Sequence, residues 1–188
     1  MKTPLFFPFR YDLAIEFVSL TLARHGRQRR IDEIAVLAYL CDRVAIARMN
    51  RPIIGGHYVA TLDGPMISEV YDMLDADTIE FRVPYADLER PFAKQDLSVK
   101  LLCDPDRQDL SEEQFAVVTD VGDSFANMAK HELENWCAEN CPEYGDLTVS
   151  EFTLIRLDRV VAILGKTNRE IAEITRKANE LSPLPFLV

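Results

Sequence analysis

The hydrophobic positions of the first fifty residues follow a helical period. In residues 11–25, Leu13 and Phe17 belong to one wide apolar stripe, a spacing that predicts a packed helix. Residues 31–49 (IDEIAVLAYLCDRVAIARM) are apolar on nearly every side, which is typical of a helix enclosed by neighbours. We therefore expect residues 31–49 to form the centre of the core.

The pattern changes after residue 51 to paired Gly, β-branched residues and an Asp-Gly turn signal. These features predict a short strand over residues 57–62. Pro65 suits the first turn of a helix, where its missing N–H costs nothing. The apolar residues that follow recur at helical spacing, so we expect a short helix over residues 66–75.

Two further segments, residues 78–83 and 98–103, alternate apolar and polar side chains, which predicts strands. Together they predict a small antiparallel sheet, with residues 84–96 as the loop between them.

Three S/T-x-x-E/Q patterns mark helix starts in the last third, because the cap hydroxyl and the third side chain satisfy each other's N–H groups. They are Ser111 with Gln114, Thr148 with Glu151, and Thr167 with Glu170. We expect helices over residues 112–140, ending near Pro142, then 149–164 and 168–181.

The length of 188 residues favours one domain. We predict a single, mainly helical α+β domain with about six helices. Residues 1–10 would be an N-terminal extension and residues 11–188 the domain, with a C-terminal helical pair at 149–181.

Charge is unevenly distributed along the chain, whose net charge is −10. Residues 61–148 carry 21 acidic and 6 basic side chains, whereas residues 1–60 carry 5 acidic and 9 basic ones. This distribution disfavours a general nucleic-acid binder or an anionic membrane surface and suits a basic protein partner. A solvated acidic surface without a partner remains the alternative.

The common phosphate-binding, hydrolase and zinc-protease motifs are missing from the sequence, so we expect no catalytic residue, no metal and no cofactor. The N-terminus shows no secretory signal, there are four Cys without a CxxC pair, and no apolar run is long enough to span a bilayer. We expect a cytoplasmic protein that does not enter the membrane. One basic cluster, Arg24, Arg27, Arg29 and Arg30, keeps a DNA-binding regulator open as the alternative function.

A set of motif residues between the core helix and residue 71 resembles the Panacea domain of SocA-like antitoxins. These are Pro52, Gly55, Tyr58, Gly64, Pro65, Val70 and Tyr71. The resemblance covers residues 11–145. The sequence departs from the family pattern at three positions. It has Val36 in place of a frequent basic residue, Gly56 in place of an Asp, and Asp63 in place of an aromatic residue.

The resemblance implies an antitoxin that neutralises a cognate toxin by binding it, with an AAA+ protease as a further partner in at least one family member. It implies no catalysis. We expect the motif residues to form a scaffold in which Tyr58 and Tyr71 pack. The acidic candidates for contact with the toxin are Asp104, Asp106, Asp109, Glu112 and Glu113.

Overall fold

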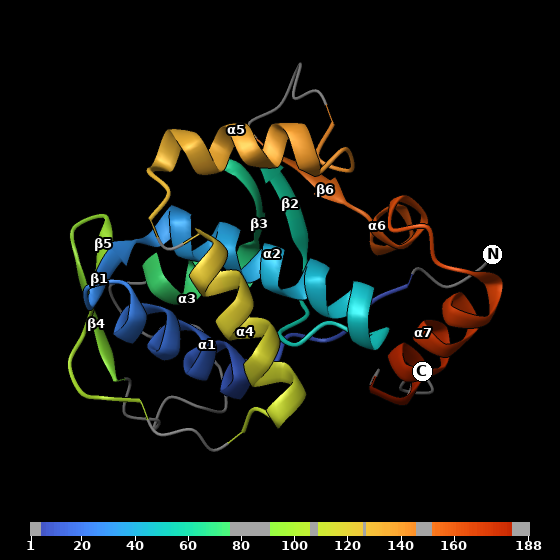
Figure 1. Ribbon diagram of the computed structural model, residues 1–188, viewed down its shortest axis with the longest axis horizontal. Coiled ribbons are helices and arrows are strands. Elements are labelled where there is room, and N and C mark those ends of the chain that lie inside the picture. Colours follow the sequence, from blue (N-terminus) through green and yellow to red (C-terminus); the bar gives the residue numbers. More distant parts are fainter. Residues whose placement is uncertain (1–4, 76–90, 106–108, 126, 146–151, 182–188) are drawn as a thin grey trace, which may run out of the picture.

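The computed structural model describes residues 5–75, 91–105, 109–125, 127–145 and 152–181. Its longest helix, α2 (Ile31–Met49), runs through the centre of the molecule (Figure 1). Side chains on all sides of α2 are buried, including Ile34, Tyr39 and Ile46, each with no exposed surface. The all-round apolar pattern of this segment therefore reflects enclosure by other elements.

Six further helices surround α2 within the described residues. Two of them, α1 and α4, pack along it, and α5 contacts the strand β3 (Gly64–Ile67) (Figure 1). Their bounds are α1 (Tyr11–Arg24), α3 (Ser68–Asp75), α4 (Glu112–Phe125), α5 (Lys130–Asn140), α6 (Leu157–Ile163) and α7 (Asn168–Leu181).

The carboxyl end of α2 is the place where the C-terminal helices attach. Lys166 donates a hydrogen bond to the carbonyl of Ala47 and Lys177 to that of Met49. Both lysines place positive charge at the negative end of the helix dipole, which stabilises the contact. Asn50 ends α2 in the left-handed conformation, with φ of 55°.

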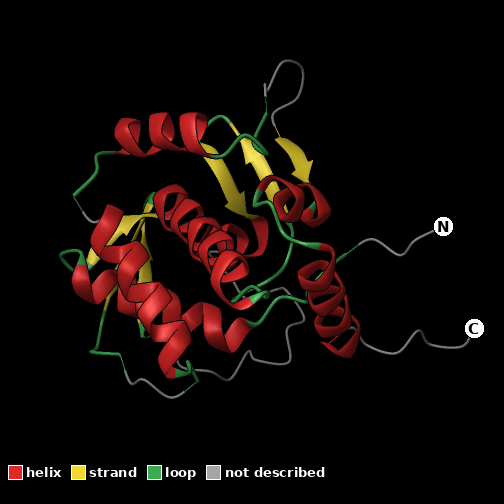
Figure 2. Cartoon of the chain, turned by 45° about the vertical axis from the view of Figure 1, so that its right-hand side comes forward, coloured by secondary structure: helices red, strands yellow, loops and turns green. Residues whose placement is uncertain are grey.

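Two three-stranded antiparallel sheets lie in different parts of the molecule (Figure 2). The first has the order β1–β5–β4 and the second β3–β2–β6. Their strands are β1 (Gln28–Arg30), β2 (Tyr58–Thr61), β3 (Gly64–Ile67), β4 (Phe92–Gln95), β5 (Ser98–Leu101) and β6 (Phe152–Ile155). The second sheet packs on α2, with β3 making the most extensive contact.

The mainly helical α+β fold class is confirmed, with seven helices in the described residues instead of about six. The helices expected at 11–25, 31–49 and 168–181 are present, as is the strand at 57–62. Two capping boxes are also confirmed. In the first, the backbone N–H of Ser111 donates to the side chain of Gln114, and the backbone N–H of Gln114 donates to the Ser111 hydroxyl. In the second, Thr167 and Glu170 exchange the same two hydrogen bonds.

Five expectations about the elements were wrong. Pro65 lies in β3, where an edge strand tolerates it, and α3 begins only after this strand. The helix expected over 112–140 is two helices, α4 and α5. Part of the helix expected over 149–164 is β6, and part of the loop expected over 84–96 is β4. One sheet was expected, and the part of the chain that the structure describes forms two.

The strand expected at 78–83 and the capping box at Thr148 lie outside the described residues.

Candidate functional site

The segment that carries Pro52 and Gly55 is held by a buried carboxylate of α2. Asp42, with no exposed surface, accepts hydrogen bonds from the backbone N–H groups of Ile53 (2.8 Å), Ile54 (2.7 Å) and Gly55 (2.8 Å). Burial raises the pKa of Asp42 to about 6, although these donors favour the charged form. The Asp42 side chain thus fixes the backbone of residues 53–55, the segment that leads into β2.

Tyr58 completes this arrangement by donating its hydroxyl to Asp42 Oδ2 at 3.0 Å. Its ring meets that of Tyr39 edge to face, with centroids 5.3 Å apart, and it is 4% exposed. Val70 is fully buried, whereas Tyr71 is half-buried against the core. Tyr58 therefore packs inside the scaffold, and Tyr71 reaches its surface.

Two glycines of the motif allow close approaches that a larger residue would block. At Gly55, with φ of +73°, a Cβ would lie 2.6 Å from the carbonyl oxygen of Pro8. At Gly64, with φ of +127°, a Cβ would lie 3.2 Å from Val36 Cγ2. Both positions combine a left-handed backbone with restricted space, which explains the need for Gly.

A second buried carboxylate ties the end of α5 to α2. Glu143, 1% exposed, accepts hydrogen bonds from the Tyr39 hydroxyl at 2.6 Å and from Arg43 Nε at 2.5 Å. Arg43 also donates to the carbonyl of Asn140. Burial and the neighbouring Glu143 raise the pKa of Tyr39, so its hydroxyl remains a donor.

Lys130, at the start of α5, joins three elements. Its ammonium lies 2.7 Å from Asp32 at the start of α2 and 2.6 Å from Asp63 in the β2–β3 turn. Burial alone would lower the pKa of Lys130, but these carboxylates raise it above its ordinary value. Asp63, which stands where the family often has an aromatic residue, therefore serves to hold α5.

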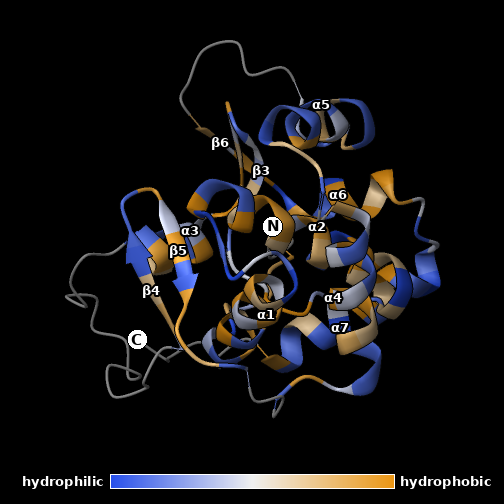
Figure 3. Ribbon diagram, turned by 60° about the vertical axis from the view of Figure 1, so that its left-hand side comes forward, coloured by the Kyte–Doolittle hydropathy of each residue, from blue (hydrophilic) through white to orange (hydrophobic). Residues whose placement is uncertain are grey.

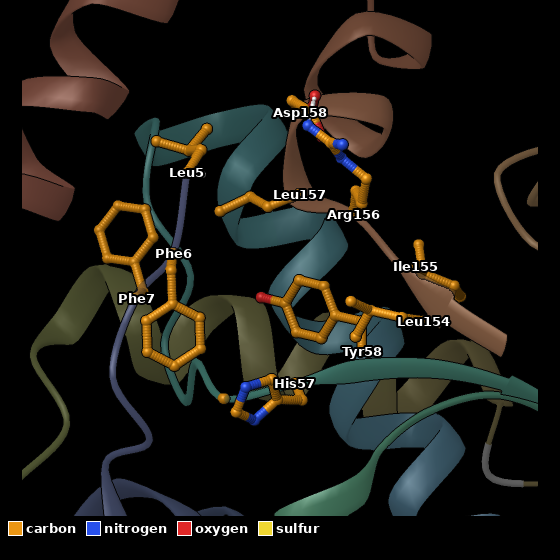
Figure 4. A pocket seen from close by; sticks show the side chains of 11 residues that line it. Leu5, Phe6, Phe7, His57, Tyr58, Leu154, Ile155, Arg156, Leu157 and Asp158 are labelled. Atoms are coloured by element: carbon orange, nitrogen blue, oxygen red, sulfur yellow. Dashed lines mark hydrogen bonds and ion pairs between the residues drawn. The ribbon is translucent and has the colours of Figure 1, made fainter. Parts of the chain in front are cut away.

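A cavity of about 400 Å³ lies beside the motif, between the N-terminal segment and β6 (Figure 4). Leu5, Phe6 and Phe7 line one side, and Leu154 lines the other. His57 lies at its edge, with its ring tilted by 37° against that of Phe6 and the ring centroids 5.0 Å apart. The cavity is mainly apolar and is suited to an apolar side chain of a partner.

Glu69 fills the space beside Gly56, where the family often has an Asp. A Cβ at position 56 would lie 2.7 Å from Glu69 Oε2. The same carboxylate accepts the backbone N–H of His57, and its other oxygen lies 2.5 Å from His57 Nδ1.

The acidic residues proposed for toxin contact do not gather at this cavity. Asp104 is exposed and pairs with Arg27 at 2.5 Å. Asp109 is exposed, as are Glu112 and Glu113 in the first turn of α4. This end of α4 lies low in Figure 1, whereas β2 and β3 lie in the upper half. Asp106 lies outside the described residues.

Each arginine of the basic cluster has a carboxylate partner within the chain. The pairs are Arg24 with Asp123, Arg27 with Asp104, Arg29 with Glu33, and Arg30 with Asp32, at 2.5 to 3.0 Å. Arg29 is also buried. Binding phosphate through this cluster would require these pairs to break.

Sequence reasoning missed Asp42, Glu143 and Lys130. For Asp42 a signal existed, because a carboxylate in the middle of an apolar helix needs partners when it is buried. For Glu143 and Lys130 the sequence offered no signal, because their partners lie about one hundred residues away.

Among the described residues, no group of three or more His, Cys, Asp or Glu side chains is placed to hold a metal ion. No helix in that part of the chain is long and apolar enough to cross a membrane.

Comparison with known proteins gives one match. A family model described as Antitoxin SocA-like, Panacea domain, matches residues 37–143. Searches of curated proteins and of solved structures found no match. The matched range begins in α2 and ends at Glu143, so it contains both buried carboxylates and the Gly64–Pro65 step. The chain belongs to the SocA-like antitoxin family of Panacea domains.

Proposed function

We propose that the protein neutralises a cognate toxin by direct protein–protein binding, without catalysis, in the cytoplasm. The observation that carries this proposal is the charge distribution. The net charge is −10, and the one basic cluster is already paired with carboxylates of the chain itself. Such a surface attracts a basic protein and repels nucleic acid.

Delivery of the bound toxin to an AAA+ protease is a second step of the proposal. Membership of the antitoxin family supports it. If this step occurs, the half-life of the toxin will shorten in cells that contain both the protein and the protease, and deletion of the protease will restore it.

The test of binding is co-expression with the product of the neighbouring gene. We expect that product to arrest growth alone, and we expect co-expression of this chain to restore growth and give a complex that co-purifies. The control is an unrelated acidic domain of similar size, which should neither rescue nor co-purify. A harmless neighbour, or rescue without a complex, would contradict the proposal.

The DNA-binding alternative predicts a salt-dependent gel shift on the upstream region of the gene, lost when Arg27, Arg29 and Arg30 are changed to Ala. The ion pairs of these arginines disfavour this outcome, because each phosphate contact would have to replace an existing carboxylate contact.

A further inference from the structure

The β3–β2–β6 sheet has an outer face that α2 does not cover. In β2, Tyr58 and Ala60 point into the core, so Val59 and Thr61 point to the other face. The register places Leu154 of β6 opposite Val59, and Leu154 therefore shares that outer face. Its side chain is 57% exposed.

An open groove of about 540 Å³ runs over this face. Val59, Met66 and Tyr71 contribute its apolar wall, and Asp63 and Asp72 its charged edge. The cavity of Figure 4 borders the same sheet, because it is lined by Leu154, the register partner of Val59. Figure 3 shows hydrophobic colour on β6, in contrast to the mainly hydrophilic α5.

The two carboxylates of the groove differ in their surroundings. Asp63 is compensated by Lys130 at 2.6 Å. Among the described residues, Asp72 has no cationic partner and no basic side chain lines the groove. Burial, together with the negative charges of Glu69 and Asp75, raises the pKa of Asp72. A cation placed beside Asp72 would relieve this repulsion.

Charge also indicates the kind of partner. An exposed apolar groove with a polar edge is typical of a protein interface. A second copy of this chain would bring the same negative groove, and a symmetric contact would place like charges together. A basic segment of another protein fits both the apolar wall and the negative edge.

We infer that the outer face of the β3–β2–β6 sheet is the toxin-binding surface, and that it accepts a segment in which apolar side chains flank a Lys or Arg. The apolar side chains pack on Val59 and Leu154, and the cation pairs with Asp72. This inference rests on the proposed function and specifies the surface that performs it.

The experiment compares matched variants of the full chain for binding to the purified product of the neighbouring gene. Asp72→Lys reverses the uncompensated charge, and Glu113→Lys makes the same change in the first turn of α4. Leu154→Thr removes the exposed apolar side chain next to Val59 while retaining β-propensity. Leu102→Thr makes the same change at a residue of similar exposure, 60%, just after the last strand residue of β5.

We expect Asp72→Lys and Leu154→Thr each to weaken binding at least about tenfold, which corresponds to about 1.4 kcal/mol. The two control variants should bind as the unchanged chain does. All four should keep its circular dichroism spectrum and unfolding midpoint, because the altered side chains are exposed.

Two outcomes would overturn the inference and leave the proposed function intact. In one, the unchanged chain binds and the groove variants bind equally well; in the other, only Glu113→Lys loses binding. If light scattering shows a dimer that Leu154→Thr dissociates, the groove is a contact between copies and the inference is wrong. If the unchanged chain does not bind at all, the proposed function fails and the inference fails with it.

Discussion

Asp42 is the residue on which the geometry of the family motif depends most directly. Its two oxygens accept three backbone N–H groups and the Tyr58 hydroxyl. These donors are buried, so removing the carboxylate leaves them without partners. An unsatisfied buried donor costs about 1–3 kcal/mol, and a protein of this size has only about 5–15 kcal/mol of stability.

We therefore expect Asp42→Ala to lower the free energy of unfolding by at least about 3 kcal/mol. Tyr58→Phe removes only one of the four hydrogen bonds and should cost about 1 kcal/mol. Urea unfolding followed by circular dichroism measures both variants. Equal, small losses in the two variants would show that Asp42 does not organise the segment.

The raised pKa of Asp42 also predicts a pH dependence. The pKa is about 6 in the folded chain, against an ordinary value of 3.8. Between these values the folded chain holds a proton that the unfolded chain releases, so the contribution of Asp42 to stability rises as the pH falls. From pH 7 to pH 5 the gain is about 1 kcal/mol.

The measurement is urea unfolding of the unchanged chain and of Asp42→Asn at both pH values. The other carboxylates titrate in both proteins, so the difference between the two isolates Asp42. The unchanged chain should gain about 1 kcal/mol more than the variant on acidification. Parallel changes in the two proteins would contradict the prediction.

At the scale of elements, α5 shows how a mainly polar helix is held in place. Only Leu133 and Cys137 of this helix are buried, so its apolar contact with the rest of the chain is small. Ion pairs and hydrogen bonds hold it at both ends, through Lys130 at the start and Glu143 just after the end. Glu143 is the more buried of the two.

We expect Glu143→Gln to lower the free energy of unfolding by about 3 kcal/mol, because Arg43 loses its buried counter-charge. The control is Glu180→Gln, which removes the charge partner of Arg176 in a pair that is more than half exposed and should change stability by less than about 1 kcal/mol. Urea unfolding compares the two. Similar small losses would show that Arg43 finds another partner.

The elements also show which parts of the fold can be predicted from one sequence. The capping boxes at Ser111 and Thr167 were predictable because both partners lie within four residues. The strand β6 was not, because it forms by pairing with β2, more than ninety residues earlier. A short apolar run fits a strand or a helix equally well until its partner is known.

The candidate site follows the same rule. The resemblance identified Gly55, Tyr58 and Gly64 as motif residues, and the structure places them around α2. Neither the carboxylate that holds them nor the groove over the outer sheet face was predictable, since each is assembled from segments distant in sequence.

At the scale of the whole molecule, many of the basic side chains are paired with groups of the chain itself. The cluster Arg24 to Arg30 is paired internally, and Lys166 and Lys177 contact the end of α2. The acidic side chains outnumber the basic ones by ten. The excess therefore acts on the surroundings as a negative field, which speeds the encounter with a positively charged protein.

This field predicts a specific dependence on salt. The association rate constant with the product of the neighbouring gene should fall about tenfold or more between 20 mM and 500 mM NaCl, because the Debye length shortens from roughly 20 Å to about 4 Å. The dissociation rate constant depends mainly on contacts made in the complex and should change much less. Surface plasmon resonance with that product immobilised separates the two constants, and potassium glutamate in place of NaCl controls for specific chloride effects. A salt-independent association rate would mean that the acidic surface only keeps the protein soluble. A dissociation rate that rises as steeply as association falls would mean that exposed ion pairs, and not the apolar groove, hold the complex together.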